Sequence, residues 1–502
     1  MKETKKYILA IDKGTTGTRA LLFDKGFDVV SQAYKEIPHL HPEPGHVEMD
    51  PEHIYGYTVE MIRECVEKSH IDPSEIEAVG ITYQRGTYLM WDRDTGKPLY
   101  NAVVWMDHRT QPGAEVLLSM DGFAEKNPER AASIRQSSSL DTYCSLAQVR
   151  RENPQLVEAM KKPGVLFGFV DTWLLWKLTD GKSFKKDSSY LAFLNKPRTL
   201  YEYDDAAMPF VGLRPDMMPQ LCPAIHDYGM MKKDILGVEL PIRAVLGDQQ
   251  SGLFAHGCRK EGQAKVTLGT VGVVDLNLGQ ELRFVPGAFP MIAWQIGDEY
   301  SYNAEGALMA GNCLKWGRDN LKLYKDFREL DQLAASVPDN GGVYFVPALS
   351  GLGAAPFFDP TARGSFMGMS LDSTREHMCR ALLESVGYAV AHLLKSMTDG
   401  ARVVSISADG GVSQGDITCQ TLANVTGATV IRPHMVEGTA LGIAELTAVA
   451  AGWYTWDETA SIMKHFGAEE FVPDLQRQEK TQKEFETWLL ACERSLHWTG
   501  KS

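Results

Sequence analysis

Glycines and threonines occupy the bend of an apolar strand-turn-strand pattern near the start of the chain. In the stretch AIDKGTTGTRA, Asp12 ends the first apolar run, and Gly14, Thr15 and Thr16 follow at the turn. Backbone N–H groups and threonine hydroxyls donate to phosphate, and glycine allows its close approach. A carboxylate repels bare phosphate, so Asp12 predicts a cation between the two, most simply hydrated Mg²⁺, while Arg19 would add positive charge.

The turn also has a purely structural interpretation, in which Asp12 caps a tight hairpin and the threonines favour its strands. A second stretch, KVTLGTVGVVDLNLG, repeats the pattern with Gly269 and Thr270 at the bend. This repetition favours phosphate binding. Two such hairpins, together with the DGG turn that contains Gly410 and Gly411, resemble the ATPase architecture of actin, Hsp70 and sugar kinases.

A third candidate lies in VLGDQQSGLFAHG, where Asp248 follows a short apolar strand. A kinase that acts on an alcohol needs a group that accepts the hydroxyl proton as the oxygen attacks phosphorus. Asp248 is the best candidate for this base. The alternative is that Asp248 only caps the helix that follows, which is a common role for aspartate.

The composition limits the classes of protein that the chain can belong to. A length of 502 residues predicts two large domains, each with its own core. The net charge of −14, without a basic run, argues against nucleic acid or an anionic membrane as a main partner. The eight cysteines are scattered without metal-ligand spacing, so we expect reduced, mostly buried thiols in a cytoplasmic protein. No apolar run approaches the ~20 residues of a membrane span or forms the core of a signal peptide.

The elements that must position these residues alternate between strand and helix, which predicts an α/β protein. We expect strands at residues 7–11 and 20–23, followed by a helix that Asp50 caps. Residues 78–82 and 88–92 are expected to form a second pair of strands.

Three further elements are expected in the second half of the chain. A long helix over residues 374–397 has Ser373 and Glu376 in the spacing of a capping box. Residues 404–427 predict a strand, a turn and a helix, and residues 437–452 predict a small-residue helix suited to close packing against a sheet.

The order of these motifs resembles the FGGY carbohydrate kinases over nearly the whole chain, and within that family most closely the glycerol kinases. The matching stretches, in the family's order, are AIDKGTTGTRALLFD, PGHVEMDPEHIY, GITYQRGTYLMWDRDTGKPLYNAVVWMDHRT, DTWLLWKL, GDQQSGLFAHGC, YFVPALSGLGAAPFFDPTARGSFMGM, DGGVSQGD and EGTALGIAELTA. The resemblance implies two ribonuclease H-like α/β domains around a central cleft. It also implies transfer of the γ-phosphate of ATP to a primary hydroxyl of a small polyol or sugar.

The two hairpins predict a domain boundary near residue 253. The resemblance implies that residues 1–253 hold the acceptor site and the first phosphate loop, and that residues 254–502 hold the second phosphate loop and the adenosine site. It also suggests a homodimer or homotetramer.

The resemblance implies roles for individual residues that match the family's motifs. Asp248 matches the catalytic base, and Asp12 and Asp248 would hold Mg²⁺. The matches to acceptor-binding positions are Arg85, Trp105, Tyr143, Asp248 and Gln249. The matches to ATP-binding positions are Gly14, Thr15, Thr16, Arg19, Gly269, Thr270, Gly311, Gly410 and Gly411.

Departures from the family's pattern concern mainly the acceptor. Glycerol kinases typically read Gln-Arg-Glu where this chain has Gln84, Arg85 and Gly86, so a carboxylate that accepts hydroxyl bonds is missing. Val273 stands where an aromatic residue is expected, which predicts a larger and less charged pocket. A buried hydrogen bond to a charged group contributes about 1.5–3 kcal/mol, enough to change the preferred acceptor. Gly415, where asparagine is usual, puts one nucleotide contact in doubt.

Three functions are therefore open at this stage. The first is a glycerol kinase-like enzyme, and the second is a kinase for polyols or ketoses of four or five carbons. The third, from a different class, is a non-catalytic actin-like protein whose interactions depend on nucleotide. Asp248, Arg85 and Trp105 argue against the third, because such a protein needs no polyol site.

Overall fold

The computed structural model describes residues 5–136, 141–196, 199–285, 287–352, 357, 359–398, 402–435 and 437–499. Part of the motif at residues 344–369, namely residues 353–356 and 358, lies outside the described residues. The chain folds into two compact units. Unit 1 contains Met1–Ala255, Ile292–Tyr300 and Glu437–Thr459, and unit 2 contains His256–Met291, Ser301–Val436 and Ala460–Ser502. The domain boundary near residue 253 stays a prediction, and the compact units differ from it because the chain returns to unit 1 twice.

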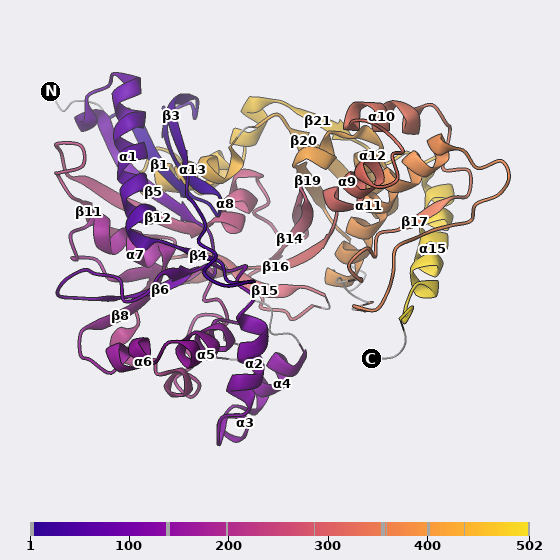
Figure 1. The fold of residues 1–502 in the computed structure, drawn as a ribbon. Helices are drawn as coiled ribbons and strands as arrows, with labels where there is room; N and C mark the ends of the chain where they lie inside the picture. Colours follow the sequence, from indigo (N-terminus) through magenta and orange to yellow (C-terminus); the bar gives the residue numbers. More distant parts are fainter. Residues whose placement is uncertain are drawn as a thin grey trace. The chain divides into compact units, whose positions relative to one another are not determined.

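The central sheet of unit 1 has six strands in the order β11-β12-β5-β1-β2-β3 (Figure 1). β5 pairs in parallel with both β1 and β12, whereas β2, β3 and β11 run antiparallel to their neighbours. The strands are β1 (Tyr7–Lys13), β2 (Gly17–Phe23), β3 (Val29–Glu36), β5 (Ile76–Tyr83), β11 (Ile225–Met231) and β12 (Leu240–Gly247). The parallel strands β1, β5 and β12 therefore end at one edge of the sheet.

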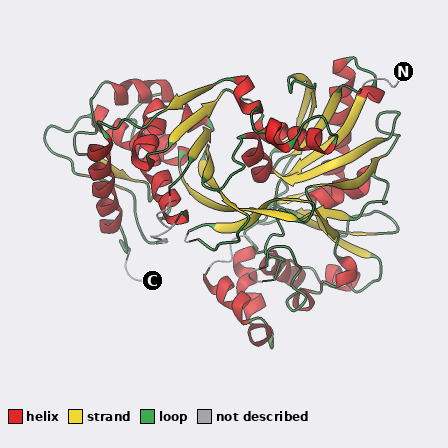
Figure 2. Cartoon of the chain, turned by 180° about the vertical axis from the view of Figure 1, so that it is seen from behind, coloured by secondary structure: helices red, strands yellow, loops and turns green. Residues whose placement is uncertain are grey.

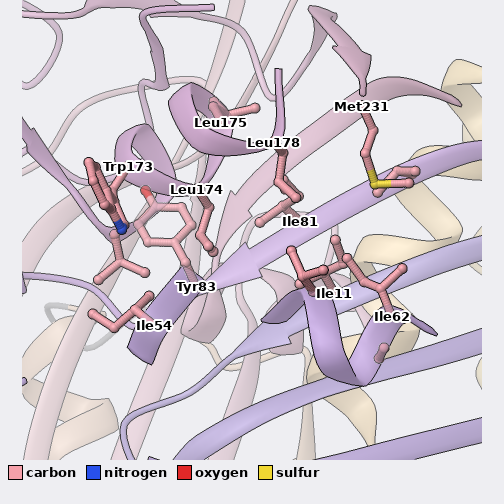
Figure 3. Packing of buried hydrophobic residues seen from close by; sticks show 14 of the residues in the cluster. Ile11, Ile54, Ile62, Ile81, Tyr83, Trp173, Leu174, Leu175, Leu178 and Met231 are labelled. Atoms are coloured by element: carbon pink, nitrogen blue, oxygen red, sulfur yellow. The ribbon is translucent and has the colours of Figure 1, made fainter. Parts of the chain in front are cut away.

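Successive side chains of a strand point to opposite faces of the sheet, and nearly all those of β1 and β5 are buried, so helices cover both faces. On one face, Ile11 and Ile81 join the core that α1 (Pro51–Ser69) and α7 (Val170–Leu178) complete (Figure 3). On the other face, Gly80 allows α13 (Gly438–Ala450) to approach, since a Cβ there would lie 2.1 Å from Thr447 Oγ1. The predicted close packing of this small-residue helix is confirmed.

The remainder of unit 1 forms a second core around a smaller sheet with the order β4-β7-β6-β8. The elements outside the central sheet are β4 (Glu48–Met49), β6 (Tyr88–Asp92), β7 (Ala102–Val103), β8 (Val165–Phe169), β9 (Lys185–Asp187), β10 (Gln220–Cys222), α2 (Thr110–Leu118), α3 (Phe123–Lys126), α4 (Pro128–Gln136), α5 (Thr142–Glu152), α6 (Pro154–Met160), α8 (Asp248–Ala255) and α14 (Trp456–Thr459). Residues 78–82 and 88–92 are strands, as predicted, but they belong to different sheets and the prediction that they form a pair was wrong. After β5 the Gln84 N–H donates to Lys13 O at the end of β1. The chain then leaves the central sheet, and β6 pairs with β8 in the smaller sheet.

The second large sheet has seven strands in the order β15-β16-β14-β13-β19-β20-β21, and its strands from β16 to β21 repeat the topology of the six-stranded sheet of unit 1. β13, β19 and β20 are parallel, and β14, β16 and β21 are antiparallel to their neighbours. The elements are β13 (Gln263–Leu268), β14 (Val271–Gly279), β15 (Phe289–Ile296), β16 (Glu299–Met309), β17 (Tyr344–Val346), β18 (Ser365–Met367), β19 (Ser405–Asp409), β20 (Thr429–Pro433), β21 (Ala468–Phe471), α9 (Gly311–Asp319), α10 (Phe327–Ala335), α11 (Arg375–Met397), α12 (Asp416–Thr426) and α15 (Gln478–Arg494). Figure 2 shows these strands among helices, and the predicted α/β class is confirmed.

The helix α11 begins one residue later than the capping pattern predicts. Thr374 is still extended, with φ −116° and ψ 171°, and it forms the capping box with His377. The pair Ser373 and Glu376 therefore does not cap the helix. The predicted helix stop at Gly427 is confirmed, since this residue ends α12 in the left-handed conformation.

The eight cysteines are all free and buried, as predicted. Within the described residues, no helix has the length and apolar character that a membrane crossing requires.

Candidate active site

Polar side chains gather at the carboxyl ends of the parallel strands of unit 1. Asp12 and Lys13 end β1, Arg85 lies two residues beyond β5, and Asp248 directly follows β12. Arg85 Nε lies 3.4 Å from Asp248 Oδ1. The same oxygen accepts a hydrogen bond of 2.8 Å from Gln249 N–H. This edge of a parallel sheet is where α/β proteins bind ligands, so the predicted base and two predicted acceptor residues lie together where chemistry is expected.

Asp12 and Lys13 form a buried, charged group beside Asp248. Burial raises the pKa of Asp12 to about 7, and the negative charges of Asp248 and Glu437 raise it too, against the positive charges of Arg19 and Lys13. Burial lowers the pKa of Lys13 to about 7, although both aspartates oppose that change. Arg19, which faces Asp12 across β1 and β2, binds the carboxylate of Glu437. A bound cation would favour the ionised form of Asp12, and the carboxylate oxygens of Asp12 suit a hard divalent metal.

The turn between β1 and β2 consists of Gly14, Thr15 and Thr16. The side-chain amine of Lys13 donates to Gly14 O at this turn. Trp105 Nε1–H donates to Thr15 Oγ1 at 3.0 Å, and the indole is 41% exposed. Trp105 is therefore not a core aromatic residue but part of the surface beside the phosphate turn.

Gly86 sits in a tight bend just after Arg85. It has a φ of +73°, and a Cβ there would lie 3.1 Å from Trp105 Cβ. The guanidinium of Arg85 lies over the ring of Tyr190, 4.9 Å from its centroid. A cavity of about 10 Å³ follows, lined by Gly86, Tyr88, Val104, Trp105, Thr110, Asp141, Thr142, Ser145 and Tyr190. This volume suits about one water molecule, so this cavity alone does not supply the larger pocket expected from the sequence.

Tyr143 does not line this cavity. It is fully buried, and its hydroxyl donates to Leu194 O at 3.0 Å and to Asp204 O at 3.3 Å. Its helical neighbours Asp141 and Ser145 line the cavity in its place. An acceptor-binding role for Tyr143 stays a prediction without support from this geometry.

The second Gly-Thr turn, Gly269 and Thr270, joins β13 to β14 in unit 2 and supports the start of α9. Gly311 N–H donates to Gly269 O, and Asn312 N–H donates to Thr270 O, both at 2.9 Å. A Cβ on Gly311 would lie 2.5 Å from Gly269 O. Glycine is therefore required where the turn and the helix meet.

The DGG turn closes the same region. Gly410 has a φ of +89°, and a Cβ there would lie 2.6 Å from the carbonyl carbon of Leu268, whereas a Cβ on Gly411 would meet nothing within 4 Å. A cavity of about 370 Å³ opens here, lined by Leu268, Gly269, Thr270, Gly311, Asn312, Leu314, Lys315, Arg318, Phe327, Leu330, Asp331, Leu383, Gly411, Val412 and Gly415. Backbone groups and small residues form one part of its wall, and apolar side chains form another. This combination suits a phosphate-bearing ligand with a flat apolar portion.

Comparison with known proteins identifies the class. Residues 7–255 match the N-terminal domain of the FGGY family of carbohydrate kinases, and residues 264–451 match its C-terminal domain. The chain is 38% identical to glycerol kinase 2 of Thermotoga maritima, over 98% of this chain and 99% of that protein. It is 37% identical to the glycerol kinase of Acaryochloris marina, with the same coverage.

Solved structures agree. A glycerol kinase of Plasmodium falciparum, crystallised with ADP, superposes with a TM-score of 0.87 at 26% identity, over 98% of this chain and 99% of that chain. A xylulose kinase of Lactobacillus acidophilus shares the fold, with a TM-score of 0.83 at 19% identity over 97% of this chain and 98% of that one.

The chain thus has the fold and sequence of a sugar kinase. It belongs to the FGGY family of carbohydrate kinases and is a phosphotransferase that uses ATP and an alcohol group of a small polyol or sugar. The predicted family, fold class and reaction type are confirmed, and nothing in these similarities favours a non-catalytic actin-like protein.

Proposed function

We propose that Asp248 is the general base of the transfer and that Asp12 and Asp248 hold Mg²⁺. The arrangement at the ends of β1 and β12 supports this proposal, because it brings two carboxylates together beside the phosphate turn. Mg²⁺, when bound, would neutralise charge on the phosphoryl group as it moves.

The residues of unit 1 then have distinct tasks. Arg85 Nε, 3.4 Å from Asp248 Oδ1, orients the carboxylate that accepts the hydroxyl proton as the acceptor oxygen attacks phosphorus. Arg85, Trp105 and Gln249 bind acceptor hydroxyls, and a role for Tyr143 stays a weaker part of the proposal. Donors to the phosphates are Gly14, Thr15, Thr16 and Arg19 in unit 1, together with Gly269 and Thr270 in unit 2. Gly311, Gly410 and Gly411 shape the cavity that we assign to the rest of the nucleotide.

The replacement Asp248→Asn tests the base. Because it keeps the shape but loses the proton acceptor, we expect ADP binding to persist while turnover falls about 10²- to 10⁴-fold. Asp94→Asn, an exposed change of the same type in the same unit, is the matched control. Turnover of Asp248→Asn within threefold of the wild type would overturn the assignment.

For the acceptor, we propose a small polyol or ketose, with glycerol as one candidate beside polyols and ketoses of four or five carbons. The observation that keeps acceptors other than glycerol open is Gly86, where glycerol kinases typically carry a glutamate, since a hydroxyl loses a charged partner there. Because the cavity beside Gly86 is small, the glutamate-to-glycine difference changes the charge of the acceptor site more than its volume. Glycerol, erythritol, erythrulose, xylulose and ribulose should be compared by kcat/KM for acceptor-dependent ADP release. Release of ADP with none of these acceptors would reject the proposed acceptor class. A strong preference for glycerol over all the others would show that the glutamate missing at residue 86 does not decide the acceptor.

We also propose a cytoplasmic homodimer or homotetramer without a nucleic-acid or membrane partner. The eight free, buried thiols support the compartment, and the net charge of −14 disfavours polyanionic partners. Light scattering of the purified protein tests the assembly, and a monomer would reject it.

A further inference from the structure

A single carboxylate stands on the apolar wall of the cavity in unit 2. Asp331, on α10, lines the cavity together with Phe327, Leu330 and Leu383. A Cβ placed on Gly415 would lie 3.1 Å from Asp331 Oδ1. Because residue 415 has no side chain, the Asp331 carboxylate can occupy this space and line the cavity.

Within the described part of the chain, no residue donates a hydrogen bond to the Asp331 carboxylate or forms an ion pair with it. Burial raises its pKa and the negative charge of Asp416 adds to the effect, against the positive charge of Arg432. A half-buried carboxylate without donors is costly, and a ligand that supplies N–H groups removes that cost. The cavity thus favours a ligand whose flat portion presents N–H donors toward Asp331.

The wall around Asp331 suits a purine. Phe327 is 45% exposed and offers a ring face for stacking, and Leu383 and Val412 provide further apolar contact. A carboxylate only accepts hydrogen bonds. Adenine presents one donor group, its 6-amino group, whereas guanine presents N1–H and the 2-amino group side by side, which matches the two oxygens of a carboxylate. Lys315, on the same cavity wall, offers a cation that can donate to the guanine O6.

We propose that Asp331 reads the nucleobase of the phosphoryl donor and that the site accepts GTP as a second donor beside ATP. This inference rests on the proposed assignment of the cavity to the nucleotide. It concerns the donor alone and is independent of which polyol or ketose is phosphorylated.

Donor kinetics test the proposal. Acceptor-dependent release of nucleoside diphosphate is measured with ATP, GTP and ITP for the wild type, for Asp331→Asn and for Glu329→Gln. Glu329 is the matched control because it lies on the same helix, accepts from Lys325 N–H and does not line the cavity. We expect kcat/KM for GTP within tenfold of that for ATP in the wild type, and a lower value for ITP, which lacks the 2-amino group.

Asparagine offers one acceptor and one donor, so its amide opposes the second N–H of guanine while it still accepts from adenine. Asp331→Asn should therefore lower the GTP:ATP ratio of kcat/KM by tenfold or more, and Glu329→Gln should leave it unchanged. A wild-type GTP value more than tenfold below ATP, or a ratio that Asp331→Asn changes by less than threefold, overturns the inference.

Calorimetric binding of GDP and ADP separates this inference from the proposed function. Loss of GDP affinity in Asp331→Asn, with ADP affinity retained, supports nucleobase recognition even where no acceptor in the panel is phosphorylated. Failure of every acceptor with every donor rejects the proposed acceptor class instead. Equal GDP affinity in the wild type and Asp331→Asn rejects the role of Asp331.

Discussion

Adding one methyl group should destabilise unit 2 at one of two adjacent glycines, Gly410, and leave it unchanged at the other, Gly411. At Gly410 the φ of +89° is in the left-handed region, and the Cβ would lie 2.6 Å from the backbone of Leu268. An L-residue in that conformation costs about 1–2 kcal/mol, and overpacking against a rigid neighbour costs about 1–3 kcal/mol. The lower entropy of the unfolded chain returns about 0.4–1 kcal/mol. Gly410→Ala should therefore lower the free energy of unfolding by about 1–5 kcal/mol.

The loss also reaches the nucleotide. Leu268 is the last residue of β13 and precedes Gly269 and Thr270, so a displaced Leu268 moves the phosphate turn. We expect ADP affinity to fall at least tenfold in Gly410→Ala. Gly411→Ala is the control for stability, because its Cβ meets nothing within 4 Å and its φ is ordinary for an L-residue.

Differential scanning calorimetry, without and with ADP, measures both effects. For a unit of this size, about 1–5 kcal/mol corresponds to a Tm about 2–20 °C lower for Gly410→Ala. Gly411→Ala should melt within 2 °C of the wild type in the absence of ADP. Equal Tm values for the two variants would show that the left-handed turn and the contact with Leu268 do not carry the stability assigned to them.

Two further predictions concern one aromatic residue and one histidine. Trp105→Phe keeps an aromatic side chain but removes the hydrogen bond to Thr15 Oγ1. Steady-state kinetics should show the acceptor KM raised about two- to tenfold. An unchanged KM would place the indole outside the acceptor site. Burial lowers the pKa of His392 to about 4, below the ~6.5 of an unfolded chain, so the unfolded state binds the proton first as pH falls between these values. Denaturant titrations should show about 1–3 kcal/mol less stability at pH 4.5 than at pH 7 from this group. The variant His392→Phe, which can keep the stacking on Phe357, should lack this loss, and an equal loss in the variant and the wild type would assign it to another group.

Local patterns in the sequence predicted the parts of the fold that depend on neighbouring residues. Asp50 caps α1 by accepting from Glu52 N–H, and the two Gly-Thr bends form hairpins, because each of these features is complete within a few residues. Pairing of strands is not local. The strand at residues 88–92 leaves the central sheet for a smaller one, and only the tertiary fold decides that.

The candidate site divides in the same way. Asp12 and Asp248 were predictable since each ends an apolar strand in a recognisable motif. Tyr190 under Arg85 in unit 1 and Asp331 in the cavity of unit 2 come from segments without a motif, and the contact of Glu437 with Arg19 depends on tertiary structure. The only signal for Asp331 was indirect, since glycine at residue 415 leaves room for a side chain from elsewhere.

The repeated topology makes the difference between the two units chemically informative. The same strand edge ends in ionisable groups in unit 1, where Asp12 and Lys13 follow the apolar part of β1, but in unit 2 the corresponding strand β13 ends in Leu268. The acid that does stand at this edge of unit 2, Asp409, is hydrogen-bonded to His256 through Oδ2. Burial works to raise the pKa of Asp409, but the hydrogen bond and charge of His256 outweigh burial and hold this pKa well below its usual range. An aspartate fixed in this way stabilises its turn and has little capacity to take a proton near neutral pH. The two proposals follow this difference: the proposed proton transfer by Asp248 belongs to unit 1, and the proposed recognition of the nucleobase by Asp331 belongs to unit 2.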